Sequence, residues 1–233
     1  MKDSFLARCA LAAYQNEPCP DGIVIDKWFS DEKTDAQAYV AIVPNERSLV
    51  IAFRGTSSWK DALIDVNAEW IDCGNGIKQH SGFYSQCVSI GGKICSDIQP
   101  LLSGMDTIYI VGHSLGGALA QMFAFNFNNN LDRRLNLVVR AFEAPRWGNG
   151  GVKRKYEAMA LDAMRYNNWG DPVPHMPTIF MGYIHAGNEV KIGCWYPFEG
   201  ILDFIQKKYS DDASTIINHD CRLTIANLEK RGL

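Results

Sequence analysis

Short apolar runs alternate with longer amphipathic stretches along this chain. The runs Thr107 to Val111 and Leu137 to Phe142 are rich in β-branched, aliphatic and aromatic residues and predict two buried strands. The segments 81–102 and 115–127 are longer and predict helices. Further predicted elements are helices at 3–15 and near 150–161, strands at 39–43, 48–53 and 163–167, and a turn at 44–47. This alternation predicts an α/β fold in which helices flank a mostly parallel sheet.

The length and composition fit one globular domain over residues 1–233. Hydrophobic residues make up 47% of the chain and charged residues 21%, which is typical of a folded protein. The net charge of −3 argues against nucleic acid as a partner. No apolar run reaches the roughly 18 residues of a transmembrane helix, so no transmembrane segment is expected.

The first residues and the cysteines bear on the compartment. Asp3 and Arg8 interrupt the stretch where a signal peptide needs apolar residues. The sequence as it stands therefore predicts a cytoplasmic protein, or a secreted one whose signal has been removed. The seven cysteines are odd in number and form no C-x-x-C pair, so we expect mostly free thiols and no zinc or redox motif, with one or two disulfides as the alternative in an exported enzyme.

The strongest chemical signal is the G-x-S-x-G motif formed by Gly112, Ser114 and Gly116. It stands between a predicted strand and a predicted helix, which is the context that a nucleophile elbow requires. The glycines leave room for a tight turn that lifts the serine hydroxyl out of the backbone. The amide of Leu115, at the helix start, can then face a developing oxyanion. The motif predicts that Ser114 is the nucleophile of an α/β-hydrolase.

A serine nucleophile needs a base, and the base needs an acid that fixes its tautomer. In α/β-hydrolases the chain order is serine, acid, histidine. Asp171 is the best acid because it follows a predicted strand and precedes two prolines that stiffen its loop. Among the histidines after this acid, His219 fits the order and spacing best, and His185 is the alternative.

A second oxyanion donor and a lid are expected near residue 56. Thr56 follows the predicted strand 48–53 and can offer its amide and its hydroxyl. The segment 57–66 is the predicted lid. Its apolar residues fall at helical spacing and fit a helix that covers an acyl groove in water, an ordinary surface helix being the alternative. These residues are Trp59, Ala62, Leu63 and Val66.

Taken together, the motifs resemble the class 3 lipase family, the fungal-type triacylglycerol lipases and their relatives. The matching segments, which fall in family order, are Phe53-Arg54-Gly55-Thr56, His80-Ser81-Gly82-Phe83, Gly112 to Ala120, Ala144 to Asn149, Gly170 to His175 and Tyr183 to Val190.

The resemblance implies a triad of Ser114, Asp171 and His219 and an oxyanion hole at Thr56 and Leu115. It makes His185 the start of a sheet strand rather than the base, and it implies a lid that begins just after Thr56. The chain departs from the family pattern at Arg222, where family members often carry a tyrosine three residues after the catalytic histidine. This departure bears on the packing around His219.

We therefore expect a carboxylic ester hydrolase, with an acylglycerol as substrate, met at a lipid–water interface. The chemistry needs no cofactor and no metal. A phospholipase A1 or a soluble short-chain esterase would use the same machinery and is the alternative. A non-catalytic α/β-hydrolase relative that only binds a ligand is the alternative from another class, and the complete set of three triad residues argues against it.

Overall fold

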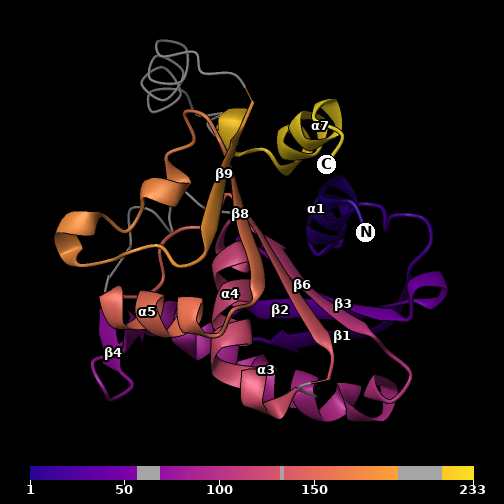
Figure 1. The fold of residues 1–233 in the computed structure, drawn as a ribbon, viewed down its shortest axis with the longest axis horizontal. Helices are drawn as coiled ribbons and strands as arrows, with labels where there is room; N and C mark the ends of the chain where they lie inside the picture. Colours follow the sequence, from indigo (N-terminus) through magenta and orange to yellow (C-terminus); the bar gives the residue numbers. More distant parts are fainter. Residues whose placement is uncertain (57–68, 132–133, 194–216) are drawn as a thin grey trace.

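The computed structural model of this chain describes residues 1–56, 69–131, 134–193 and 217–233. One sheet runs through the middle of the molecule (Figure 1). Its strands are β1 (Val24–Asp31), β2 (Ala36–Val43), β3 (Ser48–Phe53), β6 (Thr107–His113), β7 (Asn136–Phe142), β8 (Asp162–Asn168) and β9 (Asn188–Ile192). They lie side by side in chain order. The strands from β3 to β9 are parallel, and β1 and β2 are antiparallel additions at one edge.

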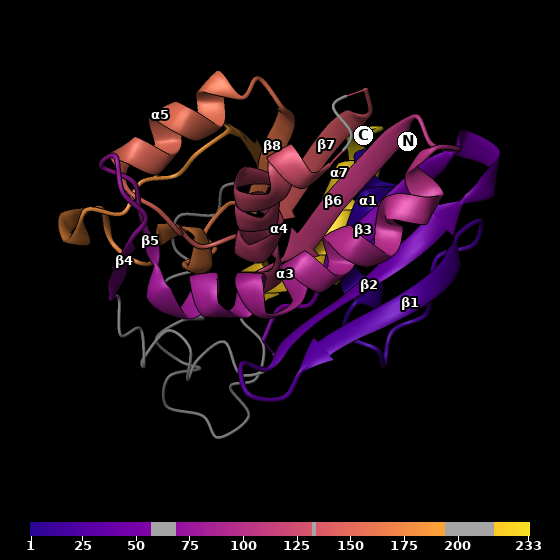
Figure 2. The ribbon, with the colours of Figure 1, turned by 90° about the horizontal axis from the view of Figure 1, so that it is seen from below.

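Helices cover both faces of this sheet (Figures 1 and 2). They are α1 (Asp3–Ala12), α3 (Ser81–Leu102), α4 (Leu115–Phe127), α5 (Gly150–Ala158) and α7 (Cys221–Lys230). Helices α3 and α4 pack on one face, while α1 and α7 lie next to each other on the opposite face. Short 3₁₀ turns are η1 (Pro44–Glu46), η2 (Asn128–Asn130), η3 (Val173–His175), η4 (Ile179–Met181) and η5 (Ile217–His219). A two-stranded ribbon, β4 (Trp70–Asp72) and β5 (Lys78–His80), stands apart from the sheet.

The two hydrophobic clusters follow from the alternation of side chains along the strands. In β3, Leu49 and Ile51 belong to the cluster under α3 and α4, whereas Val50 and Ala52 belong to the cluster under α1 and α7. Every residue of β3 is buried, as expected of a parallel strand with helices on both faces. The parallel strands therefore bring their carboxyl ends to one edge, where open α/β sheets bind ligands.

The predicted helices at 81–102 and 115–127 and the predicted α/β architecture are confirmed. The first helix ends at Ala12 rather than at residue 15, since Gln15 already has a φ of 62°. Strand β1 was not predicted, because most of its residues are exposed and form no apolar run. His185 does not start a strand: β9 begins at Asn188.

Three further sequence predictions concern the lid, a membrane-spanning helix and the cysteines. The lid segment, with Trp59, Ala62, Leu63 and Val66, lies outside the described residues and stays a prediction. Within the described ranges, no helix combines the length and the apolar character that a membrane crossing requires. The six cysteines in these ranges all carry free thiols, and Cys194 lies outside them.

Candidate active site

Ser114 occupies the sharp turn between β6 and α4. Its φ of 57° and ψ of −132° are unusual for a residue with a side chain, and such strain is held where the surroundings fix it. The Ser114 amide donates to the Phe142 carbonyl at 2.9 Å, which ties the turn to the neighbouring strand β7. A Cβ on Gly112 would lie 2.1 Å from the Gly116 oxygen, so the turn closes only with glycine there. The predicted strand–turn–helix context of the motif is confirmed.

The loop after β3 packs directly against this turn. A Cβ on Gly116 would lie 2.2 Å from the Phe53 oxygen, and a Cβ on Gly55 would lie 2.6 Å from the His113 oxygen. Thr56 follows Gly55 and therefore belongs to a loop in contact with the elbow. Leu115 is the first residue of α4, so its amide lies at the positive end of the helix dipole. The two predicted oxyanion residues thus belong to backbone segments that touch.

Asp171 and His219 meet at the same edge of the sheet, although 48 positions separate them along the chain. Oδ2 of Asp171 accepts a hydrogen bond from Nδ1 of His219 at 2.8 Å. Both side chains are buried. Oδ1 of Asp171 accepts from the Val173 amide at 2.9 Å, which fixes the carboxylate in its loop. The structure therefore joins the predicted acid to the predicted base.

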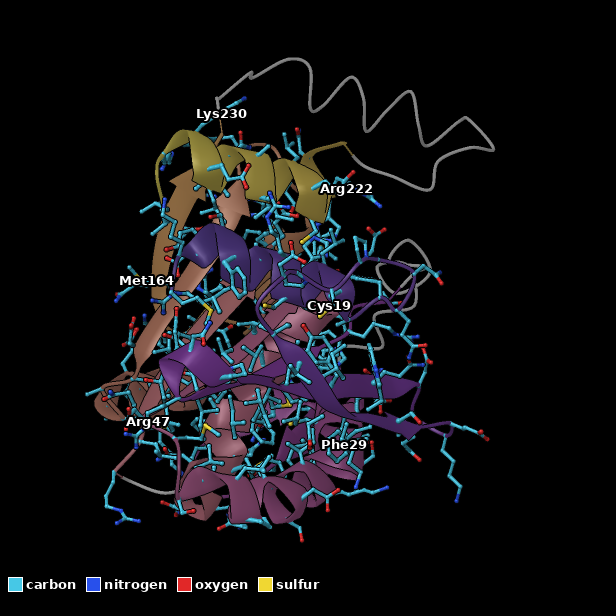
Figure 3. All side chains as sticks on the ribbon, turned by 90° about the vertical axis from the view of Figure 1, so that its right-hand side faces the viewer. Cys19, Phe29, Arg47, Met164, Arg222 and Lys230 are labelled. Carbon is cyan, nitrogen blue, oxygen red and sulfur yellow. The ribbon has the colours of Figure 1, made fainter. Side chains whose placement is uncertain are left out.

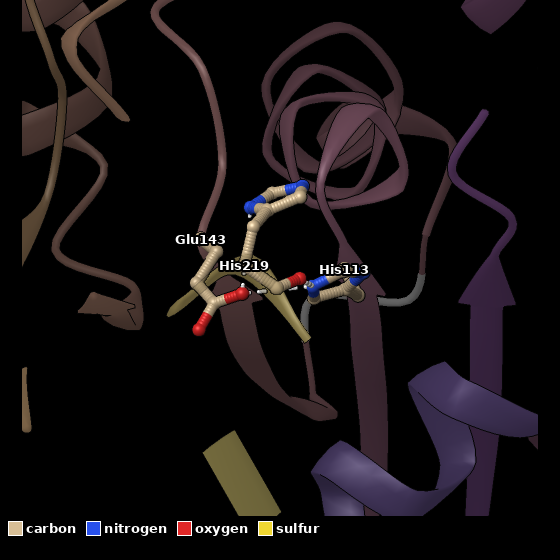
Figure 4. Close-up of side chains that lie close together, drawn as sticks. All are labelled: His113, Glu143 and His219. Atoms are coloured by element: carbon tan, nitrogen blue, oxygen red, sulfur yellow. Dashed lines mark hydrogen bonds and ion pairs between the residues drawn. The ribbon is translucent and has the colours of Figure 1, made fainter. Parts of the chain in front are cut away.

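His219 also reaches the elbow through its neighbour His113. The two imidazole rings lie 4.8 Å apart between centroids, and Nε2 of His113 bonds the His219 carbonyl at 3.0 Å (Figure 4). Since His113 directly precedes Ser114, this contact holds the His219 backbone beside the turn that carries Ser114. The carbonyl can only accept, so Nε2 of His113 carries the proton. The hydroxyl of Tyr14 then donates to Nδ1 of His113 at 3.0 Å.

The alternative base, His185, contacts the loop after Asp171 and not the Asp171 carboxyl. Its Nε2 bonds the Pro174 carbonyl at 2.6 Å, close to the loop that carries Asp171. Burial, with the nearby Arg165 guanidinium as a second cause, holds the pKa of His185 well below its usual range. A neutral histidine that donates to a backbone carbonyl stabilises the loop that carries Asp171. The geometry joins His219, rather than His185, to Asp171.

Glu143 is a buried residue of this site that the sequence analysis missed. It follows β7 immediately, has no exposed surface and adopts a φ of 55°. Its Oε2 lies 2.9 Å from Nε2 of His113 and 3.5 Å from Nδ1 of His219 (Figure 4). The available signal was a charged residue between Phe142 and Ala144, directly after a buried strand and therefore at the edge where ligands bind.

The group around Glu143 also has the composition of a metal site. Ligand atoms of His113, Glu143 and His219 all lie within 4.8 Å of one another, and all three side chains are buried. In the structure these atoms already bond each other or Asp171. A metal ion bound there would draw Nδ1 of His219 away from Asp171. The arrangement thus fits a hydrogen-bonded network better than a metal centre.

Arg222, the position that departs from the family pattern, faces away from the site. It stands near the start of α7 and points outward (Figure 3), where it pairs with Glu17 and with Asp220. Thr224, on the same helix, is fully buried and bonds the Glu143 carboxyl instead. The packing behind His219 therefore comes from Thr224 and Glu143.

A surface hollow of about 720 Å³ lies at the other end of the strands. Thr107, Asn136 and Asp162, the first residues of β6, β7 and β8, line part of it. None of the predicted site residues belongs to it. Its position at the amino ends of the strands separates it from the elbow.

Comparison with known proteins points to one family. Residues 50–181 match the family described as lipase (class 3). A lipase of Rhizopus niveus is 30% identical over 177 residues, which are 73% of this chain and 45% of that protein. The secreted mono- and diacylglycerol lipase A of Penicillium cyclopium is 28% identical over 180 residues, 73% of this chain and 58% of that protein. The chain thus spans about half the length of the curated relatives it matches.

The fold is similar to that of a solved relative. The structure of lipase II from Rhizopus niveus superimposes with a TM-score of 0.74 and 25% sequence identity. The superposition covers 81% of this chain and 78% of the other. The similarity therefore extends beyond the matched motifs to most of the sheet and its helices.

Proposed function

Since this chain belongs to the class 3 lipase family, we propose that it is a serine carboxylic ester hydrolase that acts on acylglycerols. The observation that carries the proposal is the Asp171–His219 hydrogen bond of 2.8 Å, held against the turn that bears Ser114. Acyl transfer by a serine needs a base that takes its proton and an acid that orients the base.

In the proposed mechanism, His219 acts through its two ring nitrogens. Asp171 accepts a hydrogen bond from Nδ1–H, which keeps that proton on Nδ1 and leaves Nε2 as the base that takes the proton of the Ser114 hydroxyl. The serine oxygen attacks the ester carbonyl, and the resulting imidazolium of His219 returns the proton to the leaving alcohol. Asp171 stabilises this imidazolium. Water activated by the same imidazole then releases the acid from Ser114.

The oxyanion of each tetrahedral intermediate forms close to the elbow. We assign its two donors to the backbone amides of Leu115 and Thr56. The Leu115 amide gains from the positive end of α4, and the contact between the loop after β3 and the elbow supports a shared site.

An exposed apolar turn supports a substrate at a lipid surface. In η4, Ile179 is 59% exposed, Phe180 95% and Met181 46%. Adjacent large apolar side chains on a surface are typical of contact with another apolar phase. An interface between lipid and water supplies such a phase.

Replacing Phe180 by Ser tests this contact. We expect adsorption to an emulsion to weaken by about tenfold or more, with a matching loss in the hydrolysis of emulsified triacylglycerol at low enzyme coverage, because roughly 1.5–3 kcal/mol of apolar burial at the interface is lost. Hydrolysis of a dissolved short-chain ester should remain close to that of the wild type. Equal losses on both substrates would contradict a role in surface contact.

A substrate panel tests the function itself. Emulsified triacylglycerol, phospholipid vesicles and p-nitrophenyl esters of graded length separate a lipase from a phospholipase A1 and from a soluble short-chain esterase. We expect the highest activity on acylglycerols. A preference for dissolved short esters, with no rise in rate at their solubility limit, would favour the esterase.

Reaction with a serine-directed phosphonate distinguishes the proposed enzyme from a relative that only binds a ligand. The wild type should take up one equivalent, and Ser114→Ala should take up none, because only an activated serine reacts. A folded wild-type protein that neither reacts nor hydrolyses any member of the panel would leave a binding protein as the better interpretation.

A further inference from the structure

Two carboxyl groups reach the same imidazole nitrogen in this site. Nδ1 of His219 lies 2.8 Å from Oδ2 of Asp171 and 3.5 Å from Oε2 of Glu143. The two acids come from adjacent strands, since Glu143 follows β7 and Asp171 follows β8. A triad of serine, histidine and aspartate requires only one of them. The second carboxyl, fully buried beside the base, therefore calls for an explanation.

Glu143 is held in place from several sides. The side chains of Asn168 and Thr224 both bond its Oε1. The single Nε2–H of His113 donates to Oε2 of Glu143 at 2.9 Å and is shared with the His219 carbonyl. Because these partners belong to β8, α7 and β6, the carboxyl keeps its position beside His219. Three donors around one carboxyl also allow it to carry a negative charge when the surroundings permit.

The surroundings oppose that charge while Asp171 is ionised. Burial and the nearby Asp171 carboxylate raise the pKa of Glu143 well above its usual range. Burial also lowers the pKa of His113 to about 4, so His113 offers Glu143 a hydrogen bond but no compensating charge. Two carboxylates that share one site favour a single ionised member, and the raised pKa of Glu143 makes Glu143 the one that keeps its proton. The titratable groups around Glu143 are Tyr14, His113, Asp171, His219, Asp220 and Cys221.

We propose that Glu143 is a reserve acid for His219, a positioning residue that takes over Nδ1 when residue 171 carries no negative charge. Loss of the Asp171 charge removes one of the three causes that raise the pKa of Glu143, the others being burial and the nearby Asp220 carboxylate. The Glu143 carboxylate then accepts a hydrogen bond from Nδ1–H of His219, across a gap that a small ring movement closes. His219 keeps the tautomer that leaves Nε2 ready for Ser114. The inference rests on the proposed Ser114–His219 chemistry.

The test compares four proteins on one dissolved p-nitrophenyl ester between pH 6 and pH 10. They are the wild type, Asp171→Ala, Glu143→Gln and the double variant. Alanine is chosen at 171 because an asparagine amide would present its own N–H to Nδ1. We expect Asp171→Ala to lose about 10²-fold in kcat, well short of the roughly 10⁴-fold that loss of a triad acid can cost. Its KM should change little.

The double variant carries the decisive comparison. Adding Glu143→Gln to Asp171→Ala should lower kcat by about a further 10²-fold, because no carboxylate remains for Nδ1. In the wild-type background the same change should cost no more than about tenfold, because Asp171 still orients the base. Equal kcat values for Asp171→Ala and the double variant would overturn the proposal.

The pH profile separates this role from a merely structural one. The activity of Asp171→Ala should rise with pH through an ionisation at higher pH than any limb of the wild-type profile, since buried Glu143 must first lose its proton. The double variant should lack that rise. If Glu143→Gln does not fold, the profile of Asp171→Ala alone decides, and an unchanged profile contradicts the proposal.

Glu189→Gln provides the matched control. Glu189 is a partly exposed carboxylate on β9 that bonds Asn167 and Lys191. The same substitution there should leave kcat and the pH profile of Asp171→Ala unchanged. An effect as large as that of Glu143→Gln would show a general sensitivity to lost acidic groups.

A readout that needs no turnover separates this inference from the proposed function. NMR of ¹⁵N-labelled histidine reports whether the proton of His219 resides on Nδ1. We expect the Nδ1 proton to persist in Asp171→Ala at alkaline pH and to be lost when Glu143→Gln is added. Absence of ester hydrolysis by the wild type would reject the proposed function, whereas the same tautomer in both variants would reject the reserve acid.

Discussion

At the residue scale, this site depends on which side chains keep a proton. His113 stays neutral because burial lowers its pKa to about 4, and it therefore serves as a connector between Tyr14, Glu143 and the His219 backbone. Asp171 lies in a loop where a backbone amide fixes its carboxylate. His219, the proposed base, is thus held by the Asp171 carboxyl at its ring and by the neutral His113 at its backbone carbonyl.

The three residues of the proposed triad give the most direct prediction at this scale. Ser114→Ala, His219→Ala and Asp171→Asn should each lower kcat by about 10³-fold or more, with the double variants little worse than the single ones. The asparagine amide can present an N–H to Nδ1 and favour the wrong tautomer. Steady-state kinetics with circular dichroism as the folding control measure the effect. A folded His219→Ala that keeps activity, beside a His185→Ala that loses it, would reverse the assignment of the base.

At the scale of single elements, the elbow and the first turn of α3 show two ways to fix a helix start. The elbow relies on missing side chains, since neither Gly112 nor Gly116 leaves room for a Cβ. Helix α3 relies on a side chain, because Nδ1 of His80 accepts from the Phe83 amide at 3.4 Å. Each arrangement predicts a different response to mutation.

The elbow glycine Gly116 should tolerate no side chain. Gly116→Ala would put a methyl group 2.2 Å from the Phe53 oxygen, so we expect a loss of about 3 kcal/mol or more in the free energy of unfolding, together with loss of activity. Gly92→Ala, inside α3 with nothing within 4 Å of the new methyl, is the control and should stabilise by about 0.5–1 kcal/mol. Urea denaturation measures both. Similar stabilities for the two variants would refute the steric argument.

The cap of α3 makes stability depend on pH. Burial lowers the pKa of His80 to about 4 from 6.5, so the folded state prefers the neutral ring. Between pH 6.5 and pH 4 the unfolded state binds more protons, and stability falls as the pH falls by about 1.4 kcal/mol per unit. His80→Asn keeps a cap that does not titrate. Its loss of stability from pH 7 to pH 5 should be smaller than that of the wild type by about 2 kcal/mol.

The measurement is urea unfolding of both proteins at the two pH values. The other histidines are common to both proteins, so their contributions to the pH dependence of stability cancel when the two proteins are compared. His80→Asn also loses the stacking of the ring on Phe83, which lowers stability at every pH without changing the slope. Parallel pH dependences would show that His80 is not the titrating group.

At the scale of the whole molecule, helices from the two ends of the chain form one layer. Ser4 donates through its hydroxyl to the Leu233 carbonyl at 2.7 Å, and α1 packs on α7 over the sheet. Asp3 ties this layer to the strands, because it accepts from Arg140 at 2.7 Å and from the Tyr166 hydroxyl. The helix that follows His219 is thereby anchored through α1.

Two acidic residues in this layer should differ in their contribution to stability. Asp3→Ala removes a partner of a largely buried arginine, and we expect a cost of about 1.5–3 kcal/mol. Glu229→Ala breaks an ion pair with Arg8 in which both side chains are about half exposed, and it should cost less than about 1 kcal/mol. Thermal and urea unfolding compare the two variants. Equal losses would mean that burial does not govern these pairs.

Local sequence determined the elements whose signals lie within a few neighbouring residues. The strand–elbow–helix unit from Thr107 to Phe127 was predictable, because glycine sterics and apolar runs act over short distances. The order of serine, acid and histidine, together with spacing and the loop around Asp171, likewise favoured Asp171 and His219, with His185 as the alternative base. The exposed edge strand β1 carried no such signal and was missed.

Only the tertiary structure decided which distant residues meet at His219. It joined Asp171 to His219, turned Arg222 outward and put Glu143 within 3.5 Å of Nδ1. It also showed that Nε2 of His185 bonds the Pro174 carbonyl, whereas spacing alone had left His185 open as the alternative base. The physical reason is that parallel strands bring their carboxyl ends to one edge whatever their separation along the chain. Contacts made there depend on strand order and side-chain packing, which no local pattern in the sequence encodes.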